Sequence, residues 1–252
     1  MTDTPKFLTI SEAAAFLHVS ETSLRRWTNS GKLRCFRVGG RRERRFLLSD
    51  LLAFMPPADR PASPPAAPAI ADARERHISL FFRDPDEQWQ LLRPYLLAHL
   101  RDNNPVLYIQ DSTPPERLLG WLHAEGLPVD ELRARALLQV LPPHQAYLLA
   151  GRFDVQRMLA FMESAILAAY AAGHTRVLLT GEMTWSLAGP PGAERMMAYE
   201  ALLNPLVEKY PTATIICQYD LKRFDAISVL DALLTHPSAQ LPGGLVAGFY
   251  GL

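Results

Sequence analysis

Residues 8–33 read LTISEAAAFLHVSETSLRRWTNSGKL, and residues 37–46 read RVGGRRERRF. The first stretch predicts two short helices around a tight turn, with Ser11 and Ser20 as the residues that cap them. The second stretch predicts a hairpin, because Gly39-Gly40 suits a tight turn between two short strands. Together the two stretches predict a small helix-turn-helix domain that carries an arginine-rich wing.

The second predicted helix has the residue types of a helix that reads DNA. Leu24 and Trp27 are spaced as a buried stripe, which leaves hydroxyl and arginine side chains for the other faces. Such side chains can reach base edges from the major groove, and arginines on a wing can contact phosphates. We therefore predict double-stranded DNA as the partner. The candidate DNA-binding residues are Ser20, Thr22, Ser23, Arg25, Arg26, Arg37, Arg41, Arg42 and Arg44.

The alternative is that these arginines form only a solvated face on a small helical bundle. Six arginines lie between residues 34 and 45, where they would repel one another without a polyanion to neutralise them. The charge balance along the chain also favours DNA. Residues 1–55 hold 10 Lys and Arg against 5 Asp and Glu, whereas the remainder holds 16 against 21. Clustered positive charge of this kind directs nucleic-acid binding to one end of the chain.

The first 55 residues resemble winged helix-turn-helix modules of the MerR and excisionase type. The elements that carry the resemblance are Ala13-Ala14, Arg26-Trp27, Gly31-Lys32-Leu33, Gly39-Gly40 and Ser49-Asp50-Leu51. The resemblance implies a DNA-binding domain. MerR-type regulators dimerise through a long helix after this module, whereas prolines follow it here, so we expect a homodimer formed by the rest of the chain.

A proline-rich stretch separates two predicted domains. Residues 56–76 read PPADRPASPPAAPAIADARER, in which prolines remove backbone donors and no large apolar side chain but Ile70 is present. We expect a linker there, between a head of residues 5–55 and a body of residues 77–252. The chain has no apolar run long enough for a membrane span and no signal peptide, so we expect a cytoplasmic protein without membrane association.

The body has the alternating pattern of a doubly wound α/β domain, with apolar runs between amphipathic stretches. Predicted parallel strands are residues 77–82, 105–110, 136–141, 175–181 and 213–219. Predicted helices are residues 86–101, 115–125, 154–172, 193–209 and 225–234, and the tail after residue 244 could add an edge strand. The fold class is therefore α/β: a small winged domain plus a mostly parallel, doubly wound sheet.

The body lacks the motifs of the common enzyme classes. The first strand is followed by RDPDEQWQ, which has no glycine or lysine to cradle phosphates, and no GxSxG, HExxH or zinc-type Cys/His spacing occurs. The two cysteines, Cys35 and Cys217, allow neither a disulfide framework nor a metal site from their spacing. We expect no enzymatic activity, no cofactor and no metal.

The body resembles the MEDS (methanogen/methylotroph, dichloromethane-regulator sensory) domain, a RecA/KaiC-like fold without a phosphate loop. The resemblance covers most of residues 77–240. It rests on His77, residues 108–111, 181–185 and 217–220, Arg223-Phe224 and residues 235–237. It implies a domain that senses a small molecule, a hydrocarbon or one-carbon derivative. His77 and His236 are also compatible with purely structural roles.

Parallel topology brings the residues that follow the strands to one edge of the sheet, where such sheets bind ligands. The candidate ligand-binding residues are Asp111, Glu182, Met183, Trp185, Tyr219, Asp220 and Arg223. Aromatic, thioether and a few charged groups suit a small, largely apolar ligand. Trp185 and Met183 could equally be packing residues. A carboxylate such as Glu182 is costly after a buried strand unless it is paired, with Arg223 or His144 as the expected partner.

Taken together, these patterns predict a DNA-binding transcription regulator whose C-terminal domain senses a small molecule and dimerises. Two alternatives remain open. The body could be a protein-interaction scaffold without a ligand, or it could carry out nucleotide chemistry through a loop that the motifs do not reveal.

Overall fold

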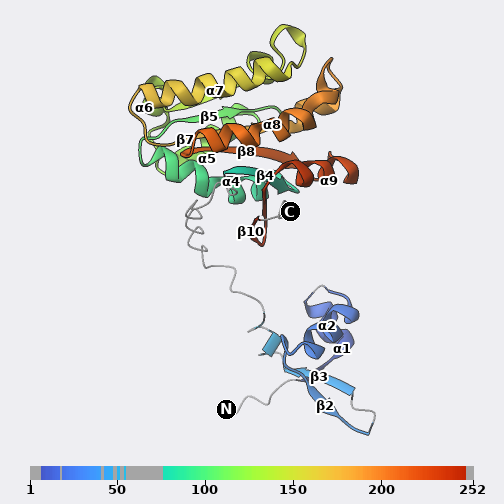
Figure 1. Cartoon of the computed structure of the whole chain (residues 1–252). Coiled ribbons are helices and arrows are strands. Elements are labelled where there is room, and N and C mark those ends of the chain that lie inside the picture. The colour runs from blue at the N-terminus through green and yellow to red at the C-terminus, as the bar shows by residue number, and fades with distance from the viewer. Residues whose placement is uncertain are drawn as a thin grey trace. The chain divides into compact units, whose positions relative to one another are not determined.

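The computed structural model describes residues 7–17, 19–40, 43–47, 50–51, 54 and 76–247. The chain divides into two compact units, the head within residues 1–63 and the body within residues 64–252 (Figure 1). The predicted linker lies outside the described residues, except for Arg76, and so do the candidate DNA contacts Arg41 and Arg42.

The head contains the two helices and the hairpin that the sequence predicts. Its described elements are β1 (Phe7–Thr9), α1 (Ile10–Phe16), α2 (Glu21–Asn29), β2 (Phe36–Val38) and β3 (Glu43–Leu47). The strands form an antiparallel sheet in the order β1-β3-β2. Apolar side chains of the helices and strands form one small core, which contains Leu8, Ala13, Ala14, Leu24, Leu33, Phe46 and Leu51.

The helix caps of the head agree with the sequence prediction at one helix and differ at the other. Ser20 caps α2, since its Oγ accepts the backbone N–H of Ser23 at 3.2 Å. The prediction that Ser11 caps α1 was wrong. Thr9 is the cap, because Glu12 three residues on allows a reciprocal capping box in which each side chain accepts the other's backbone N–H.

Seven strands of the described body form one sheet in the order β10-β9-β4-β8-β7-β5-β6. The strands are β4 (His77–Phe82), β5 (Val106–Ile109), β6 (Leu138–Leu141), β7 (Val177–Glu182), β8 (Ala213–Asp220), β9 (Ser238–Leu241) and β10 (Gly244–Ala247). All neighbours pair in parallel except β9 and β10. The predicted doubly wound sheet is confirmed. The sequence pattern missed β9, a half-polar strand that lies between β10 and β4.

Helices cover both faces of this sheet (Figure 1). They are α4 (Pro85–Leu100), α5 (Pro115–Ala124), α6 (Val129–Ala134), α7 (Val155–Ala171), α8 (Met196–Lys209) and α9 (Ala226–Thr235). Helices α4, α5 and α6 enclose one apolar core, and α7, α8 and α9 enclose the other. Among the described helices, none is long and apolar enough to cross a membrane.

The connections after β5 and β7 define the place where a ligand or a polar network fits best. Strand β5 leads into α5 on one face of the sheet, whereas its neighbour β7 leads toward α8 on the other face. The two connections therefore diverge at the carboxyl ends of these strands, which is the topological switch point of a doubly wound sheet.

Candidate functional site

The exposed face of α2 carries the side chains that the sequence predicts to contact DNA. Thr22, Arg25 and Arg26 are exposed, and Ser20 is exposed at the start of the helix. Arg25 forms an i,i+4 ion pair of 2.8 Å with Glu21, and both side chains are solvated. An exposed pair of this kind is worth little, so Arg25 is available to a phosphate or a base.

The hairpin is fixed to α2 by one arginine. Arg44 of β3 donates from Nε to Thr28 Oγ1 at 3.1 Å and from Nη2 to Asn29 Oδ1 at 2.7 Å. Arg44 is half-buried, whereas Arg37 on the neighbouring strand β2 is exposed. Arg44 was predicted to bind DNA, and in this structure it braces the wing against the helix.

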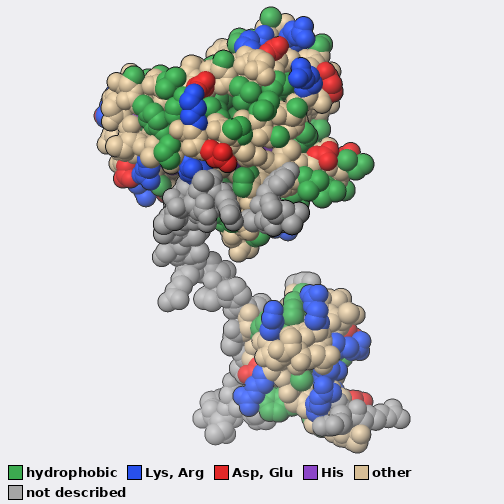
Figure 2. Space-filling model, viewed as in Figure 1, with side chains coloured by type: hydrophobic (Ala, Val, Ile, Leu, Met, Phe, Trp, Pro, Cys, Tyr) green, Lys and Arg blue, Asp and Glu red, His purple; other side chains and the backbone are tan. Residues whose placement is uncertain are grey.

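A groove of about 470 Å³ runs beside α1, α2 and the hairpin. Its lining residues are Thr9, Ile10, Ser11, Arg25, Arg37, Glu43, Arg44 and Arg45. Lys and Arg side chains gather over the visible face of the head in Figure 2. The head thus presents a positive, concave surface next to its exposed helix.

In the body, the switch point between β5 and β7 contains a buried carboxylate. Glu182 ends β7 and is 1% exposed. Its Oε2 accepts the backbone N–H groups of Asp111, Ser112 and Thr113 at 2.5 to 2.9 Å, and also the Ser112 hydroxyl at 3.0 Å. Charge-assisted hydrogen bonds from several amides can offset the desolvation of a buried carboxylate. Glu182 therefore holds the loop that follows β5.

The other oxygen of Glu182 belongs to a network of buried side chains. Its Oε1 accepts Tyr108 Oη–H at 2.8 Å and Gln88 Nε2–H at 3.2 Å. Gln88 also donates to Gln218 Oε1 at 2.8 Å, and Gln218 donates to Thr180 Oγ1 at 2.9 Å. Burial and the nearby Glu182 carboxylate raise the pKa of Tyr108 well above its usual value. The network joins β5, β7, β8 and α4.

These contacts correct the partner that the sequence suggested for Glu182. Neither Arg223 nor His144 is among the groups that donate to it. Backbone amides take that place, because the parallel pairing of β5 with β7 brings residues 111–113 directly over the end of β7. Loop backbone donors carry no signature in the amino-acid sequence.

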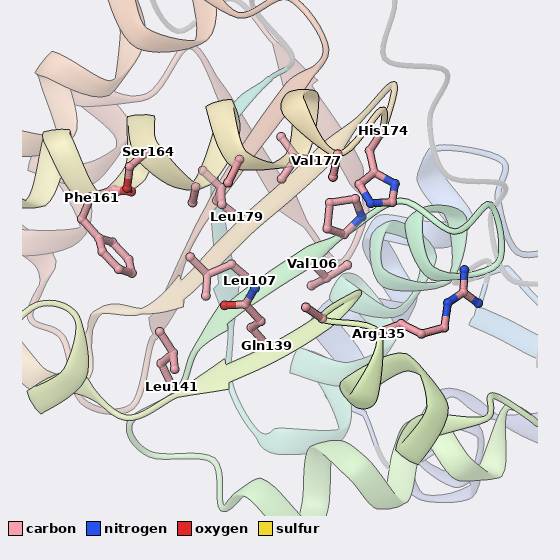
Figure 3. A pocket seen from close by; sticks show the side chains of 16 residues that line it. Val106, Leu107, Arg135, Gln139, Leu141, Phe161, Ser164, His174, Val177 and Leu179 are labelled. Carbon is pink, nitrogen blue, oxygen red and sulfur yellow. The ribbon is translucent and has the colours of Figure 1, made fainter.

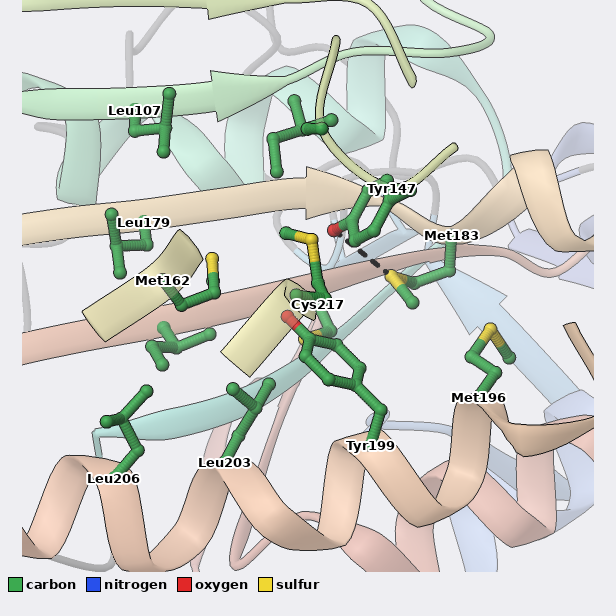
Figure 4. Packing of buried hydrophobic residues seen from close by; sticks show 14 of the residues in the cluster. Leu107, Tyr147, Met162, Leu179, Met183, Met196, Tyr199, Leu203, Leu206 and Cys217 are labelled. Carbon is green, nitrogen blue, oxygen red and sulfur yellow. Dashed lines mark hydrogen bonds between the residues drawn. The ribbon is translucent and has the colours of Figure 1, made fainter. Parts of the chain in front are cut away.

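Three other candidate ligand residues lie within the core of the body. Met183, Trp185 and Tyr219 are at most 3% exposed. Trp185 stacks on Tyr147 with ring centroids 4.9 Å apart, and the Tyr147 hydroxyl points at Met183 Sδ at 3.6 Å (Figure 4). Each of these residues already has protein neighbours, so a ligand could reach them only if this packing opened.

The position of Tyr147 explains why residue 181 is a glycine. A Cβ atom on Gly181 would lie 2.0 Å from the Tyr147 hydroxyl oxygen. The ring of Tyr147 stacks on Trp185 and also neighbours the tilted ring of Phe153, so it cannot withdraw without loss of packing. Gly181 is therefore required for the close approach of this ring to β7.

The remaining three candidates lie nearer the surface. Asp111 is exposed and accepts the Thr184 hydroxyl at 2.6 Å. Asp220 is half-buried and accepts the backbone N–H of Lys222 at 2.9 Å, and Arg223 is exposed. The seven candidates therefore divide into a buried group and a surface group.

A cavity of the body lies elsewhere, between α7 and the sheet, with a volume of about 370 Å³. Figure 3 shows side chains of β5, β6 and β7 facing those of α7 across it. Its walls include Leu107, Leu141, Phe161 and Leu179, with Gln139, Ser164, His174 and Arg135 as polar groups. None of the seven candidates lines it. The sequence pattern missed it because small residues of α7, such as Ala165 and Ala168, leave this space.

A second group that sequence reasoning missed is a cluster of four buried side chains with metal-ligating atoms. His77, Glu200, Cys217 and His236 are at most 3% exposed, and their ligating atoms all lie within 4.8 Å of one another. They come from β4, α8, β8 and the residue after α9. The sequence separations match no short metal motif, and the four meet only when α8 and α9 pack against one face of the sheet.

Burial is the largest single influence on the pKa values of His77, Glu200 and Cys217, but contacts within the cluster outweigh it at Glu200. Burial and the neighbouring His236 lower the pKa of His77, against contacts with Glu200 and Asn204 that raise it. Burial alone would raise the pKa of Glu200, but hydrogen bonds with His236 and His77 outweigh it and lower it. Burial raises the pKa of the Cys217 thiol well above its usual value, and Glu200 adds to this shift.

The start of α4 lacks the free backbone amides with which related sheet domains bind nucleotide phosphates. A phosphate-binding sheet domain uses the helix that follows its first strand to hold phosphates. Here Asp84 occupies that position, and its Oδ1 accepts the backbone N–H of Glu87 at 2.9 Å. Glu87 in turn accepts the backbone N–H of Arg83. Two carboxylates take up the amide donors that a phosphate would need.

A helix-turn-helix head with a positive groove, joined to an α/β body with a cavity, defines a DNA-binding regulator with a separate sensory domain. Comparison with known proteins agrees. Residues 7–55 match a family model described as a helix-turn-helix domain. Residues 76–237 match the model of the methanogen/methylotroph, DcmR sensory domain. The chain belongs to this MEDS family.

Individual relatives were also found. The chain is 31% identical over 247 residues to the transcriptional repressor DcmR of Methylorubrum extorquens, covering 92% of this chain and 90% of that protein. A KaiC-like protein of Pyrococcus horikoshii is structurally similar, with a TM-score of 0.46 and 8% identity over 66% of this chain and 71% of that chain. The chain is thus a DNA-binding member of the MEDS family and a homologue of a transcriptional repressor.

The contacts of Glu182 predict a loss of stability on substitution. In Glu182→Gln one carboxylate oxygen becomes an amide group that can only donate, so it would face either the loop amides or Gln88 Nε2. We expect the free energy of unfolding to fall by about 1 to 3 kcal/mol, measured by urea denaturation at neutral pH. Glu131→Gln, at an exposed helical position, should change it by less than about 0.5 kcal/mol. Equal stabilities of the two variants would refute the bracing role of Glu182.

Proposed function

We propose that this protein is a ligand-responsive transcription regulator that binds double-stranded DNA as a homodimer and senses a small, largely apolar molecule in its body. The observation that carries the proposal is the exposed helix α2 beside a groove lined by four arginines, on a chain whose second domain is a sensory domain by family.

The head supports a winged mode of DNA binding. Helix α2 would lie in the major groove, where Thr22, Arg25 and Arg26 would reach bases and phosphates. Arg37 on the wing would contact the phosphate backbone, and Arg41 and Arg42 remain predicted contacts. Arg44 would act indirectly, because it holds the wing at a fixed place against α2.

Two arginine substitutions separate reading of sequence from phosphate binding. Arg37→Ala should weaken binding to every duplex alike and lower the slope of log K against log salt by about one. Arg25→Ala should reduce the preference for the DNA upstream of the gene over an unrelated duplex. Fluorescence anisotropy titrations over a range of salt concentrations measure both effects. Arg135→Ala in the body is the control, and a salt-independent affinity of the unaltered protein would contradict DNA binding through this surface.

The cavity beneath α7 supports small-molecule sensing. Its volume is in the range of small-ligand sites, and its walls are mainly apolar with a few polar groups at the rim. A hydrocarbon or one-carbon derivative would be held there largely by burial of its apolar surface. The strand-end residues are the other proposed location, and a ligand there would first meet Asp111, Asp220 and Arg223, which lie nearer the surface.

A thermal-shift screen with small hydrocarbons, halogenated hydrocarbons and one-carbon alcohols tests sensing. A ligand present at about 100 times its Kd should raise the melting temperature by about 5 to 10 °C. Ala165→Leu would fill part of the cavity and should abolish the shift, whereas Ala171→Leu, at an exposed position of the same helix, should keep it. Loss of the shift in Arg223→Ala instead would locate the ligand at the strand ends, and no shift with any compound would contradict sensing of this class.

An apolar stripe on α9 supports a dimer formed by the body. Ile227, Leu230 and Leu234 are 71%, 54% and 50% exposed and follow helical spacing along one face. A second copy of the same stripe is a fitting partner, because one small winged domain makes too few contacts for tight operator binding. Pairing two heads would double those contacts.

The mass of the protein in solution tests this interface. Light scattering after size-exclusion chromatography should give the mass of two chains for the unaltered protein and of one chain for Leu230→Asp. Leu167→Asp, at a 48% exposed position of α7, should remain dimeric. If the unaltered protein is a monomer, the stripe is instead the docking surface of the alternative, a DNA-tethered interaction scaffold.

A further inference from the structure

We propose that His77, Glu200, Cys217 and His236 form a binding site for one divalent transition-metal ion, with zinc as the ion that fits the ligand set best. The site lies inside the body and is separate from the cavity beneath α7. It goes beyond the proposed function, since neither DNA binding nor small-molecule sensing requires it.

Four of the six distances among the ligand atoms are close to those around a tetrahedral ion, and all four ligand atoms lie within 4.8 Å of one another. Glu200 Oε2 lies 3.3 Å from His77 Nε2, 3.3 Å from His236 Nε2 and 3.1 Å from Cys217 Sγ, and Cys217 Sγ lies 3.8 Å from His77 Nε2. Ligands bound to zinc at about 2.0 to 2.3 Å in tetrahedral geometry are about 3.3 to 3.8 Å apart. The cluster is therefore arranged to accept an ion with little movement.

The outer contacts of the two histidines aim their ligating nitrogens at the centre of the cluster. His77 Nδ1 lies 2.7 Å from Asn204 Oδ1, and the Asn204 amide is oriented by donation from Nδ2 to the Thr235 carbonyl at 3.0 Å. His236 Nδ1 lies 2.7 Å from the carbonyl oxygen of Ala232. Since both partners can only accept, each Nδ1 carries a proton and donates. In a neutral ring the lone pair is then on Nε2, which is the arrangement of metal-bound histidines.

Charge also favours a cation at this place. Glu200 is a carboxylate with 0% exposure, and no Lys or Arg contact to it is found among the described residues. A divalent ion bound by Glu200 and by the thiolate form of Cys217 gives a site of zero net charge. Binding breaks the S–H bond of Cys217 and releases that proton to solvent. A neutral, fully ligated site is compatible with deep burial, whereas an isolated carboxylate is costly there.

The chemistry of the ligand set selects the class of ion. Imidazole and thiolate ligands favour zinc and its tetrahedral analogue cobalt over calcium or magnesium, which prefer oxygen ligands. Four protein ligands without exposure to solvent indicate a closed, structural site and not a catalytic one. The ion would fasten β4, α8, β8 and the end of α9 to one another.

Metal titration of the full-length protein tests the site. After loading with Zn²⁺ and dialysis, we expect about one zinc ion per chain by elemental analysis and a higher melting temperature than in the chelator-treated protein. Loading with Co²⁺ should give the intense d–d bands of a tetrahedral complex and a thiolate-to-cobalt charge-transfer band. Cys217→Ser should lose the charge-transfer band, and Cys35→Ser, the matched control in the head, should keep it.

A substitution outside the ligand set keeps the test decisive if Cys217→Ser does not fold, which circular dichroism would reveal. Asn204→Ala removes the group that orients His77, together with its bond to the Thr235 carbonyl, and keeps all four ligands; it should weaken zinc binding about 10- to 100-fold. A folded protein that retains no zinc or cobalt and melts at the same temperature with and without zinc would overturn the proposal. So would a cobalt spectrum that is the same in folded Cys217→Ser and in Cys35→Ser.

Discussion

The body depends on how one buried carboxylate is satisfied. Glu182 ends the interior strand β7, at the point where the connections after β5 and β7 leave the sheet on opposite faces, and it accepts the three amides of the loop after β5. The same side chain connects through Tyr108 and Gln88 to β8 and α4. A carboxylate removed from water must keep all these donors, so the loop, the strand ends and the first helix are held in one arrangement. The surface candidates Asp111 and Asp220 lie on this fixed frame.

Much of the fold follows from the sequence, because it rests on local patterns. The apolar runs of the central strands and the Ser20 cap each encode their structure within a few residues, and both are read correctly. The N-cap of α1 shows where prediction from local patterns fails. Ser11 and Thr9 are both good caps, and only the reciprocal bond with Glu12 decides between them.

The sites were less predictable, because they depend on long-range contacts. The strand-end rule placed Asp111 near Glu182, and the Asp111 backbone N–H lies 2.9 Å from Glu182 Oε2. The rule could not show that backbone amides would be the partners of the carboxylate. It also placed Tyr219 at an open crevice, whereas its hydroxyl points at the buried Glu200 at 3.3 Å. The His77, Glu200, Cys217 and His236 cluster joins residues up to 159 positions apart in the chain. These four side chains come together only when the sheet and helices pack, and no spacing in the sequence predicts the cluster.

The bracing of the wing by Arg44 has a consequence for recognition. Thr28 and Asn29 hold this guanidinium against the end of α2, so helix and hairpin form a preorganised unit before any duplex arrives. The conformational entropy of aligning them is then lost when the domain folds and not when the complex forms. On the proposed mode of binding, such a rigid head would discriminate between operators by the fit of their groove geometry, and would tolerate little variation in it.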